Sequence, residues 1–345
     1  MELMRVLGDL DVSGKRVFVR ADLDVPVVTT NDKRPTTNAE QVTRLTNLRP
    51  TVDWLFDHGA SKIIIAGHID RPQKPDPAFS TEQIKERLEA ILSRSVIFTG
   101  NFDREILEDL VLLENLRFWP GETKNDPEFA KQLASLADVY VNEAFGNSHR
   151  NHASMVALPS LLPHAAGVHL EEEVKTLSGL LLAPKRLFVA IVGGAKIETK
   201  EPLIEHLAKI ADYVLVGGEL VRELTVNGLQ QLTDNSKVMV ATLTADTKDI
   251  DEVSIEKFKA IISGARTIVW NGPMGVFEEG FEAGTLAVAE AILASRAYTV
   301  VGGGETTQFL AAKNLLSHFS FVSSGGGAML AFLAGKTLPG LAALE

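Results

Sequence analysis

The sequence contains no cysteine. That absence excludes disulfide bonds, thiolate metal sites and cysteine nucleophiles. Basic residues are also few relative to acidic ones, because 34 lysines and arginines stand against 45 acidic residues, which gives a net charge of −11. A protein whose main role is to bind nucleic acid usually shows the opposite balance. Against this acidic background, a local concentration of arginine and histidine is informative.

Long uncharged apolar runs are missing as well. No apolar stretch reaches 18 residues without a charge, so the sequence predicts no membrane-spanning helix. The first residues, Met1 to Arg5, lack the apolar segment of a signal peptide. The histidines show no close pairing at metal-ligand spacing, which argues against a zinc site. We therefore expect a soluble cytoplasmic protein that binds neither membrane nor nucleic acid.

What is present is a regular alternation of short apolar runs with amphipathic helical patterns. A chain of 345 residues with 45% hydrophobic residues can form two domains with full cores. Continuous apolar strands separated by helices predict parallel sheets covered on both faces. We therefore predict an α/β fold of two doubly wound, Rossmann-like domains. The predicted strands are residues 16–20, 62–66, 95–98, 111–116, 139–141, 187–192, 213–216, 238–243, 267–270, 298–301 and 319–323.

Two helical patterns help to define the organisation. Apolar residues recur at helical spacing between Gln41 and Phe56, and Pro50 is predicted to begin or kink a helix there. A second pattern, over residues 170–182, is predicted to connect the two domains. Ligands of open α/β sheets bind at the carboxyl ends of the strands, so we expect the two domains to face each other across a cleft.

Glycine-rich turns follow the strands of the second half, and a helical pattern follows each turn. Such turns leave backbone N–H groups unshielded at the positive end of a helix dipole, which suits phosphate. Their number, together with Lys196 and Lys200, points to a polyphosphate ligand. The turns are Gly193-Gly194-Ala195-Lys196, Gly217-Gly218-Glu219, Asn271-Gly272-Pro273-Met274-Gly275, Gly302-Gly303-Gly304-Glu305 and Gly325-Gly326-Gly327.

The strand ends of the first half carry cations in place of glycines. Each cation taken alone could be a surface charge, but their shared position favours a pocket for a small, multiply anionic ligand. Asp22 and Asp24, which follow the first strand, would add two carboxylates to that pocket. The cations are Arg44, His68, Arg71, Arg117, His149 and Arg150.

Two familiar nucleotide motifs are not supported. Ala334-Gly335-Lys336-Thr337 resembles the end of a P-loop, but Leu330 stands at the first required glycine and a helical pattern precedes the stretch. We interpret it as the end of a helix. None of the glycine turns fits the G-x-G-x-x-G pattern of nicotinamide dinucleotide enzymes.

Several segments, in the same order along the chain, resemble the phosphoglycerate kinase family. The resemblance extends from about residue 12 to the last residues. The segments are RVFVRADLDVP (16–26), LLENLRF (112–118), AFGNSHR (144–150), GGAK (193–196), VWNGPMGVFE (269–278), FSFVSSGGGA (319–328) and LPGLAAL (338–344).

The resemblance implies a two-domain hinge enzyme that moves a phosphoryl group between 1,3-bisphosphoglycerate and ADP-Mg²⁺. The products, 3-phosphoglycerate and ATP, belong to glycolysis and gluconeogenesis. The implied organisation is a phosphoglycerate-binding domain (residues 1–168), an inter-domain helix (169–184), a nucleotide-binding domain (185–326) and a C-terminal segment that returns to the first domain (327–345). A monomer with no macromolecular partner is the family expectation.

The resemblance also implies roles for individual residues. Arg44, Lys200, Gly303 and Gly326 would act at the transferred phosphoryl group, and Glu305 would reach Mg²⁺. The phosphoglycerate would be bound by Asp22, Asp24, Arg44, His68, Arg71, Arg117 and Arg150. The nucleotide would be held by Lys196, Lys200, Gly217, Asn271, Glu278, Gly302, Gly303, Gly304, Glu305 and Thr306.

The chain departs from the family pattern at several of these positions. Asp24 replaces an asparagine, Glu143 an aspartate and Glu305 an aspartate. Glu219 and Asp251 stand where glycines usually border the base, and the chain is shorter than typical members, chiefly between Gly218 and Thr267. Two alternatives therefore stay open beside an active phosphoglycerate kinase. One is a kinase of a related small carboxylate, and the other is a non-catalytic metabolite-binding homologue.

Overall fold

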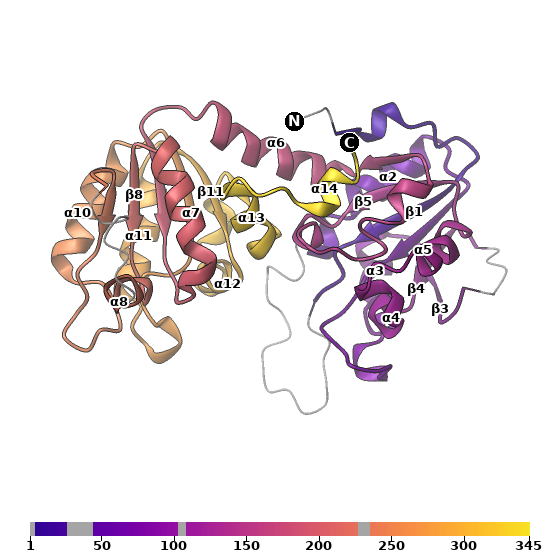
Figure 1. Cartoon of the computed structure of the whole chain (residues 1–345), viewed down its shortest axis with the longest axis horizontal. Coiled ribbons are helices and arrows are strands. Elements are labelled where there is room, and N and C mark those ends of the chain that lie inside the picture. The colour runs from indigo at the N-terminus through magenta and orange to yellow at the C-terminus, as the bar shows by residue number, and fades with distance from the viewer. Residues whose placement is uncertain (1–3, 26–43, 103–107, 227–234) are drawn as a thin grey trace. The chain divides into compact units, whose positions relative to one another are not determined.

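The structure, a computed structural model, describes residues 4–25, 44–102, 108–226 and 235–345. The chain divides into two compact units: unit 1 comprises Met1–Val174 and Thr337–Glu345, and unit 2 comprises Lys175–Lys336 (Figure 1). Gln41 and Val42, where one predicted helical pattern begins, and Pro26, which ends a family motif, lie outside the described residues.

Unit 1 is built on a six-stranded parallel sheet with the strand order β3-β4-β2-β1-β5-β6. The central strand β1 pairs with β2 on one side and β5 on the other, which places Val17 opposite Ile63 and Val139. This arrangement confirms the predicted doubly wound sheet. The strands are β1 (Arg16–Ala21), β2 (Lys62–Ala66), β3 (Ile97–Thr99), β4 (Leu110–Leu113), β5 (Val139–Glu143) and β6 (His164–Ala166).

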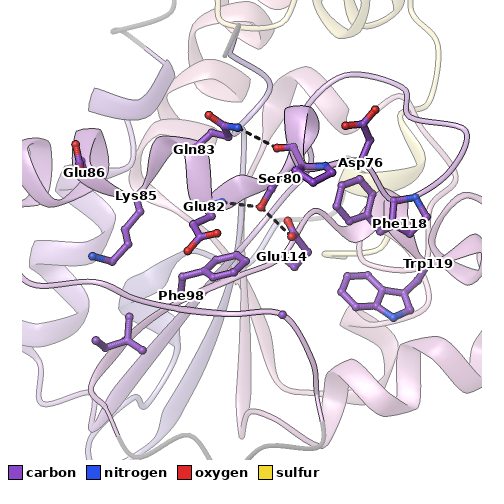
Figure 2. A pocket seen from close by; sticks show the side chains of 14 residues that line it. Asp76, Ser80, Glu82, Gln83, Lys85, Glu86, Phe98, Glu114, Phe118 and Trp119 are labelled. Atoms are coloured by element: carbon purple, nitrogen blue, oxygen red, sulfur yellow. Dashed lines mark hydrogen bonds between the residues drawn. The ribbon is translucent and has the colours of Figure 1, made fainter. Parts of the chain in front are cut away.

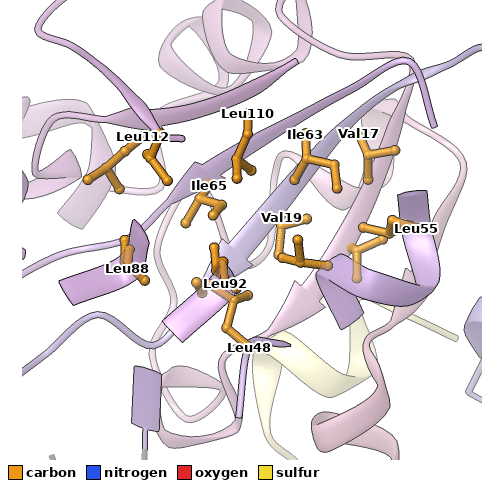
Figure 3. Packing of buried hydrophobic residues seen from close by; sticks show 14 of the residues in the cluster. Val17, Val19, Leu48, Leu55, Ile63, Ile65, Leu88, Leu92, Leu110 and Leu112 are labelled. Carbon is orange, nitrogen blue, oxygen red and sulfur yellow. The ribbon is translucent and has the colours of Figure 1, made fainter. Parts of the chain in front are cut away.

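The apolar strands of unit 1 are buried on both faces, as their continuous hydrophobic sequences predict. On one face, Val19 and Ile65 pack with Leu55 and Leu88 from the helices that cover it (Figure 3). On the other face, Phe18 of β1 stacks on Tyr140 of β5, with ring centroids 6.1 Å apart. Burial on both faces fixes the register of the sheet and hence the positions of the loops at its carboxyl edge.

Helices and 3₁₀ turns complete unit 1. Pro50 lies in the first turn of α2, where its missing N–H costs no helical hydrogen bond, as predicted. The helices are α2 (Arg49–Asp57), α3 (Lys85–Leu92), α4 (Pro120–Thr123), α5 (Pro127–Ala134) and α14 (Pro339–Ala342). The 3₁₀ turns are η1 (Leu7–Asp9), η2 (Pro77–Phe79), η3 (Thr81–Ile84), η4 (Leu116–Phe118), η5 (Phe145–Asn147) and η6 (Pro159–Leu161).

Unit 2 repeats the architecture with the strand order β12-β11-β10-β7-β8-β9. Strands β7, β8 and β9 are added toward one edge of the sheet, and β10, β11 and β12 toward the other edge. The strand order therefore reverses between the neighbouring strands β7 and β10, and open α/β sheets bind ligands at such a switch point. The strands are β7 (Phe188–Val192), β8 (Tyr213–Val216), β9 (Val238–Val240), β10 (Thr267–Asn271), β11 (Tyr298–Gly302) and β12 (Phe321–Val322).

The helices of unit 2 pack on this sheet. Apolar residues of α10, α11 and α12 join one core with Ile191 and Trp270 of the sheet, while α7 and α13 contact each other. The elements are α7 (Ile197–Ile210), α8 (Leu220–Val226), α10 (Glu252–Ser263), α11 (Ala283–Ala294), α12 (Gly304–Ala312), α13 (Gly326–Leu333), η7 (Phe277–Glu279) and η8 (Leu316–His318). The predicted connector is α6 (Val168–Leu182), which begins in unit 1 and ends in unit 2.

Some details differ from the sequence predictions. Strand β6 was not predicted, because three residues, His164 to Ala166, give too short a pattern. The helix after the third glycine turn begins only at Ala283, since the N–H groups of Gly280 and Phe281 first fold back onto Phe277 and Val276. Residues 327–336, expected to return with the C-terminus, lie in unit 2 because α13 packs on α7, and only 337–345 return to unit 1.

Two further predictions can be compared with the structure. Gly335 has a φ of +73° and follows α13, and its N–H returns to Phe332 O, so the P-loop-like stretch is the end of a helix as interpreted. Among the described residues, no helix is both long and apolar enough to cross a membrane.

Candidate functional site

The predicted cations of unit 1 meet at the carboxyl edge of its sheet. Strands β4, β2, β1 and β5 are neighbours, and the loops after them carry the predicted side chains. Arg71, Arg117 and Arg150, together with His152, line a cavity of about 500 Å³. We call these four residues and His68, whose ring centroid lies 6.4 Å from that of His152, the cationic pocket.

The positive charges in this pocket are close enough to perturb one another. Burial, followed by the charge of Arg150, lowers the pKa of Arg117 to about 10. Burial and the charge of Arg71 likewise lower the pKa of Arg150. The Nε atoms of Arg117 and Arg150 are buried with no hydrogen-bond partner. The fold thus holds like charges together and leaves N–H donors unsatisfied, which is the state that an anionic ligand would relieve.

Asp22 and Asp24, which follow β1, and Arg44, which precedes α2, lie beside the pocket. Arg44 donates from Nη1 to the backbone oxygen of Asp24 at 3.0 Å and lies 3.9 Å from Asp22 Oδ1. Asp24 accepts the N–H of Asp70 through Oδ1 at 2.8 Å. Burial raises the pKa of Asp24, and the neighbouring charge of Asp22 acts in the same direction. The carboxylate of Asp24 is therefore held in place by the Asp70 N–H, while burial and the nearby charge of Asp22 disfavour its ionised form.

A set of buried polar side chains that the sequence analysis did not single out is hydrogen-bonded to His68 of the cationic pocket. Arg20 is fully buried and donates to Ser154 Oγ at 2.8 Å and to His68 Nδ1 at 2.9 Å. Ser154 in turn donates to the buried carboxylate of Glu122 at 2.6 Å. One signal was available, because Arg20 lies inside an otherwise apolar strand, where a charged residue needs a buried partner.

In unit 2, the loops after β10, β11 and β12 converge with the first turn of α7. Lys200 of α7 is buried and its Nζ hydrogen-bonds to Asn271 Oδ1. A Cβ atom on Gly303 would lie 2.9 Å from Asn271 Nδ2, and one on Gly326 would lie 3.2 Å from Gly303 Cα. Gly303 caps α12 and Gly326 begins α13, so two helix N-termini meet beside a buried lysine. We call these four residues the phosphate cluster.

The chemistry of the phosphate cluster fits an anion. Burial lowers the pKa of Lys200 to about 8, against the opposing effect of Glu305. Asn271 Nδ2 is a buried donor without a partner. A Cβ on Gly304, the first residue of α12, would meet no atom within 4 Å, so the backbone there is open to a ligand. Unshielded N–H groups, a helix dipole and a desolvated cation together favour phosphate oxygens.

Five other residues are predicted to hold the nucleotide. For some of them, packing or a hydrogen bond within the protein already accounts for the residue type at that position. Gly217 and Gly302 need to be glycine for packing, because a Cβ would lie 2.6 Å from Met274 Sδ and 2.3 Å from Met329 Sδ respectively. Thr306 Oγ1 accepts the N–H of Gly272 at 2.8 Å and so orders two turns. Lys196 and Glu278 are exposed. Contact of these residues with a nucleotide stays a prediction.

The two carboxylates expected near the base also differ from each other. Asp251 caps α10 by accepting the N–H of Ser254 at 2.8 Å, a role that its replacement of glycine did not suggest. Glu219 is exposed directly after Gly218, which has a φ of +69°. The side chain of Asp251 therefore has a structural role as a helix cap, whereas the side chain of Glu219 is exposed.

Glu305 is the candidate metal residue. Among the described residues no group of three or more His, Cys, Asp or Glu side chains could hold an ion. Glu305 Oε2 is 3.6 Å from the position of a Cβ on Gly194, next to the first glycine turn. Mg²⁺ in kinases is held by one or two carboxylates together with substrate phosphates and water. A single carboxylate beside the phosphate cluster fits that kind of ion.

A larger cavity in unit 1, of about 1180 Å³, has the wrong charge for an anion. Figure 2 shows acidic side chains around it, with Glu114 hydrogen-bonded to Ser80. Its one lysine, Lys85, lies 3.1 Å from Glu89. Size alone therefore does not identify the substrate site, and the smaller cationic pocket is the better candidate.

A cationic pocket on one parallel α/β unit and a phosphate cluster on another fit the class of nucleotide-dependent phosphotransferases. The comparisons agree with this class. A family model described as phosphoglycerate kinase matches residues 7–230 and 223–336. Proteins named phosphoglycerate kinase from Desulforudis audaxviator and Rubrobacter xylanophilus are each 38% identical, covering 99% of this chain and 99% and 98% of their own lengths.

Solved structures give the same result. A phosphoglycerate kinase structure from Coxiella burnetii matches with a TM-score of 0.86 and 30% identity, and 99% of each chain is covered. The chain therefore belongs to the phosphoglycerate kinase family. The alignment with the Desulforudis protein runs over 397 positions, more than the 345 residues of this chain, so that relative carries segments that this chain lacks.

Proposed function

We propose that this chain transfers a phosphoryl group reversibly between 1,3-bisphosphoglycerate and ADP, giving 3-phosphoglycerate and ATP. Membership of the family supports the reaction, and the observation that carries it is the cationic pocket. Arg71, Arg117 and Arg150 surround a cavity of about 500 Å³ at the edge of the sheet where α/β proteins bind ligands. A small molecule with a phosphate and a carboxylate matches that charge and size.

In unit 1, Arg71, Arg117 and Arg150 would bind the end of the phosphoglycerate that does not react. His68 would donate a further hydrogen bond, and Asp22 and Asp24 would accept from the hydroxyl group. Arg44 lies at the side of this pocket, beside both aspartates. We propose that it engages the migrating phosphoryl group, because a guanidinium can contact two of its oxygens at once.

In unit 2, the phosphate cluster would bind the nucleotide phosphates. Lys200 would supply a positive charge, Asn271 a side-chain N–H, and Gly303, Gly304 and Gly326 the backbone N–H groups at two helix N-termini. Lys196, Glu278 and Thr306 would complete the nucleotide site with Gly217 and Gly302. The bound Mg²⁺ of ATP would neutralise charge on the phosphate oxygens, and Glu305 would hold it directly or through water.

This division of labour suits phosphoryl transfer. The reaction needs in-line positioning and stabilisation of charge on the equatorial oxygens, with little covalent participation by the protein. The residues proposed for each ligand belong to different units, so neither unit would be competent alone. We propose that hinge motion brings the ligands together and excludes water from the acyl phosphate. We also propose that the enzyme acts as a cytoplasmic monomer.

An assay with 3-phosphoglycerate and ATP-Mg²⁺ that links ADP formation to NADH oxidation tests the proposal. Turnover with 3-phosphoglycerate is the expected result. Turnover only with another small acid would make the chain a kinase of a related carboxylate. Thermal stabilisation by 3-phosphoglycerate without any turnover would make it a metabolite-binding homologue.

The proposed metal role of Glu305 has its own test. Glu305→Gln keeps the size of the side chain and removes its charge, so half-maximal activity should require more Mg²⁺ than in the wild type. Glu279→Gln is the matched control, because Glu279 is exposed and pairs with Lys248 at 2.6 Å. An unchanged Mg²⁺ requirement in Glu305→Gln would show that the residue does not contact the ion, even through water.

A further inference from the structure

A chain of buried hydrogen bonds leads from the interior of unit 1 to the cationic pocket. Glu122 is fully buried, and its carboxylate accepts two hydrogen bonds from Ser154. The backbone N–H of Ser154 donates to Oε2 at 3.0 Å, and the Ser154 hydroxyl donates to Oε1 at 2.6 Å. Ser154 Oγ accepts from Arg20 Nε at 2.8 Å, and Arg20 Nη2 lies 2.9 Å from His68 Nδ1. Tyr140 fixes the far side of Ser154 by donating to its backbone oxygen at 2.9 Å.

The contact between Arg20 and His68 determines where the imidazole carries its proton. A guanidinium has N–H donors and no acceptor, so the His68 Nδ1 that faces it must present a lone pair. A neutral ring then carries its single proton on Nε2. Protonation of Nδ1 would place two donors and two positive charges 2.9 Å apart, so the ring stays neutral as well.

The other groups that face His68 favour the same state. Burial, followed by the charges of Arg20, Arg117, Arg150 and His152, lowers the pKa of His68 well below its ordinary value. The nearest carboxylate oxygen, Asp24 Oδ2, lies 3.8 Å from Nε2, which is beyond hydrogen-bond distance. Nε2 is therefore a buried atom without a hydrogen-bond partner, on a side chain that is only 1% exposed.

We propose that Arg20, Ser154 and Glu122 are positioning residues that hold His68 as a neutral imidazole with its proton on Nε2, so that it offers one fixed N–H donor to an anionic oxygen in the cationic pocket. Glu122 has a part in this, because its negative charge balances that of Arg20. Burial alone would raise the pKa of Glu122. Its contacts with His152, Arg20 and Ser154 outweigh that effect and hold the pKa below its ordinary value. The identity of the ligand rests on the proposed function, but the protonation state does not.

A neutral donor serves this site better than a charged one. The pocket already concentrates guanidinium groups, and a further positive charge would add repulsion in the absence of ligand. A neutral Nε2–H can donate to a ligand oxygen without first taking up a proton. The binding contribution of His68 should therefore be independent of pH between about 5 and 8, unlike that of an ordinary histidine with a pKa near 6.5.

The direct test is the ¹⁵N spectrum of the imidazole groups in ligand-free, histidine-labelled protein, with His68 assigned from the signal lost in His68→Asn. We expect a pyrrole-type Nε2 and a pyridine-type Nδ1 that do not titrate between pH 5 and 8. A protonated Nδ1, or a ring that titrates near pH 6.5, would overturn the proposal. This measurement needs no turnover, so it can fail or succeed independently of the proposed reaction.

Variants separate positioning from general stability. Arg20→Met and Ser154→Ala should each introduce a second tautomer or a titration of His68, and Arg20→Met should raise KM for 3-phosphoglycerate about tenfold, the scale for losing one hydrogen bond to a charged oxygen. The control is Arg16→Met, on the same strand, whose partner Asp138 lies at the surface. Because Arg20→Met could fail to fold, Ser154→Ala and the wild-type spectrum keep the test decisive. An unchanged His68 spectrum in Ser154→Ala would contradict the proposed role of the chain.

Discussion

Arg44 differs in its contacts from the arginines that line the cationic pocket. It contacts the backbone of Asp24 and lies 3.9 Å from Asp22, so its guanidinium is held at the side of the cationic pocket. Arg71, Arg117 and Arg150, by contrast, line the cavity itself. We expect Arg44 and these three arginines to have different roles, and kinetics can separate them because ground-state and transition-state contacts change KM and kcat differently.

We expect Arg44→Ala to lower kcat by roughly 10²–10³-fold, the scale for losing one preorganised electrostatic donor, with little change in the KM for 3-phosphoglycerate. Arg71→Ala and Arg117→Ala should chiefly raise KM, because those residues would hold the non-transferring end. Arg44→Lys should restore little, since an ammonium cannot reproduce the two-pronged contact. Steady-state kinetics decide the matter, and a steep rise in KM with preserved kcat in Arg44→Ala would make Arg44 a binding residue.

Lys200 gives a pH prediction in the other unit. Burial lowers its pKa to about 8, so above that pH part of the free protein carries a neutral amine. Phosphate oxygens favour the charged form, and ADP binding at pH 8 should therefore take up protons. Calorimetry of ADP binding in buffers of different ionisation enthalpy measures this uptake.

The matched variants are Lys200→Arg and Lys209→Arg, on the same helix α7. Lys200→Arg should abolish most of the proton uptake, because arginine stays charged at pH 8. Lys209 is exposed, and its replacement should leave the uptake unchanged. Equal proton uptake in all three proteins would show that Lys200 does not contact the nucleotide.

At the scale of elements, the beginning of α6 depends on a carboxylate from the sheet. Glu143, at the end of β5, accepts from the N–H of His169 at 3.0 Å and from Thr51 Oγ1 at 2.8 Å. Thr51 Oγ1 also accepts the N–H of Val168 at 2.8 Å. Burial raises the pKa of Glu143 to about 7, although these donors oppose the shift. A strand, α2 and the helix that continues into unit 2 are thus joined at one buried point.

Thr51→Val should lower the free energy of unfolding by about 1–3 kcal/mol, because it leaves the N–H of Val168 without its acceptor and removes one of the donors to the buried Glu143 carboxylate. The loss should be larger at pH 8.5 than at pH 5.5. The folded-state pKa of Glu143 is raised, so the carboxyl is protonated at low pH and needs the hydroxyl donor most after it ionises, as pH rises through about 7. Urea unfolding at both pH values measures the difference.

The control for this prediction is Thr123→Val, because Thr123 is exposed on the short helix α4. Its free energy of unfolding should change little at either pH. If Thr51→Val destabilised the protein equally at pH 5.5 and 8.5, the hydroxyl would not be supporting an ionised Glu143.

The elements could be predicted where their pattern is long and local. Strands β2 and β8 begin and end as predicted, because β-branched runs bounded by turns are an unambiguous signal. Strand β6 could not be predicted, because three residues are too few to show a strand pattern. These residues are a strand because they pair with β5, which the local sequence does not reveal. The candidate site followed the same rule. Residues at strand ends could be singled out from the sequence, whereas Arg20, Glu122 and Ser154 depend on contacts between distant segments that only the fold defines.

At the scale of the whole molecule, the two candidate sites lie in different units of a chain that is shorter than the relatives aligned with it. Each site is organised within one unit: the cationic pocket in unit 1 and the phosphate cluster in unit 2. The central claim is that the acid substrate and the nucleotide bind to different units. If that is correct, each ligand can be weakened separately by a single substitution.

Calorimetric titration of 3-phosphoglycerate and ADP into Arg150→Ala and Lys200→Met tests this claim most directly. Arg150→Ala should weaken 3-phosphoglycerate binding by about 10–100-fold, the scale for one charge-assisted hydrogen bond, and leave the Kd for ADP unchanged. Lys200→Met should weaken ADP binding and leave 3-phosphoglycerate binding unchanged. Loss of both ligands in either variant, or the reverse pattern, would contradict the assignment of the two sites.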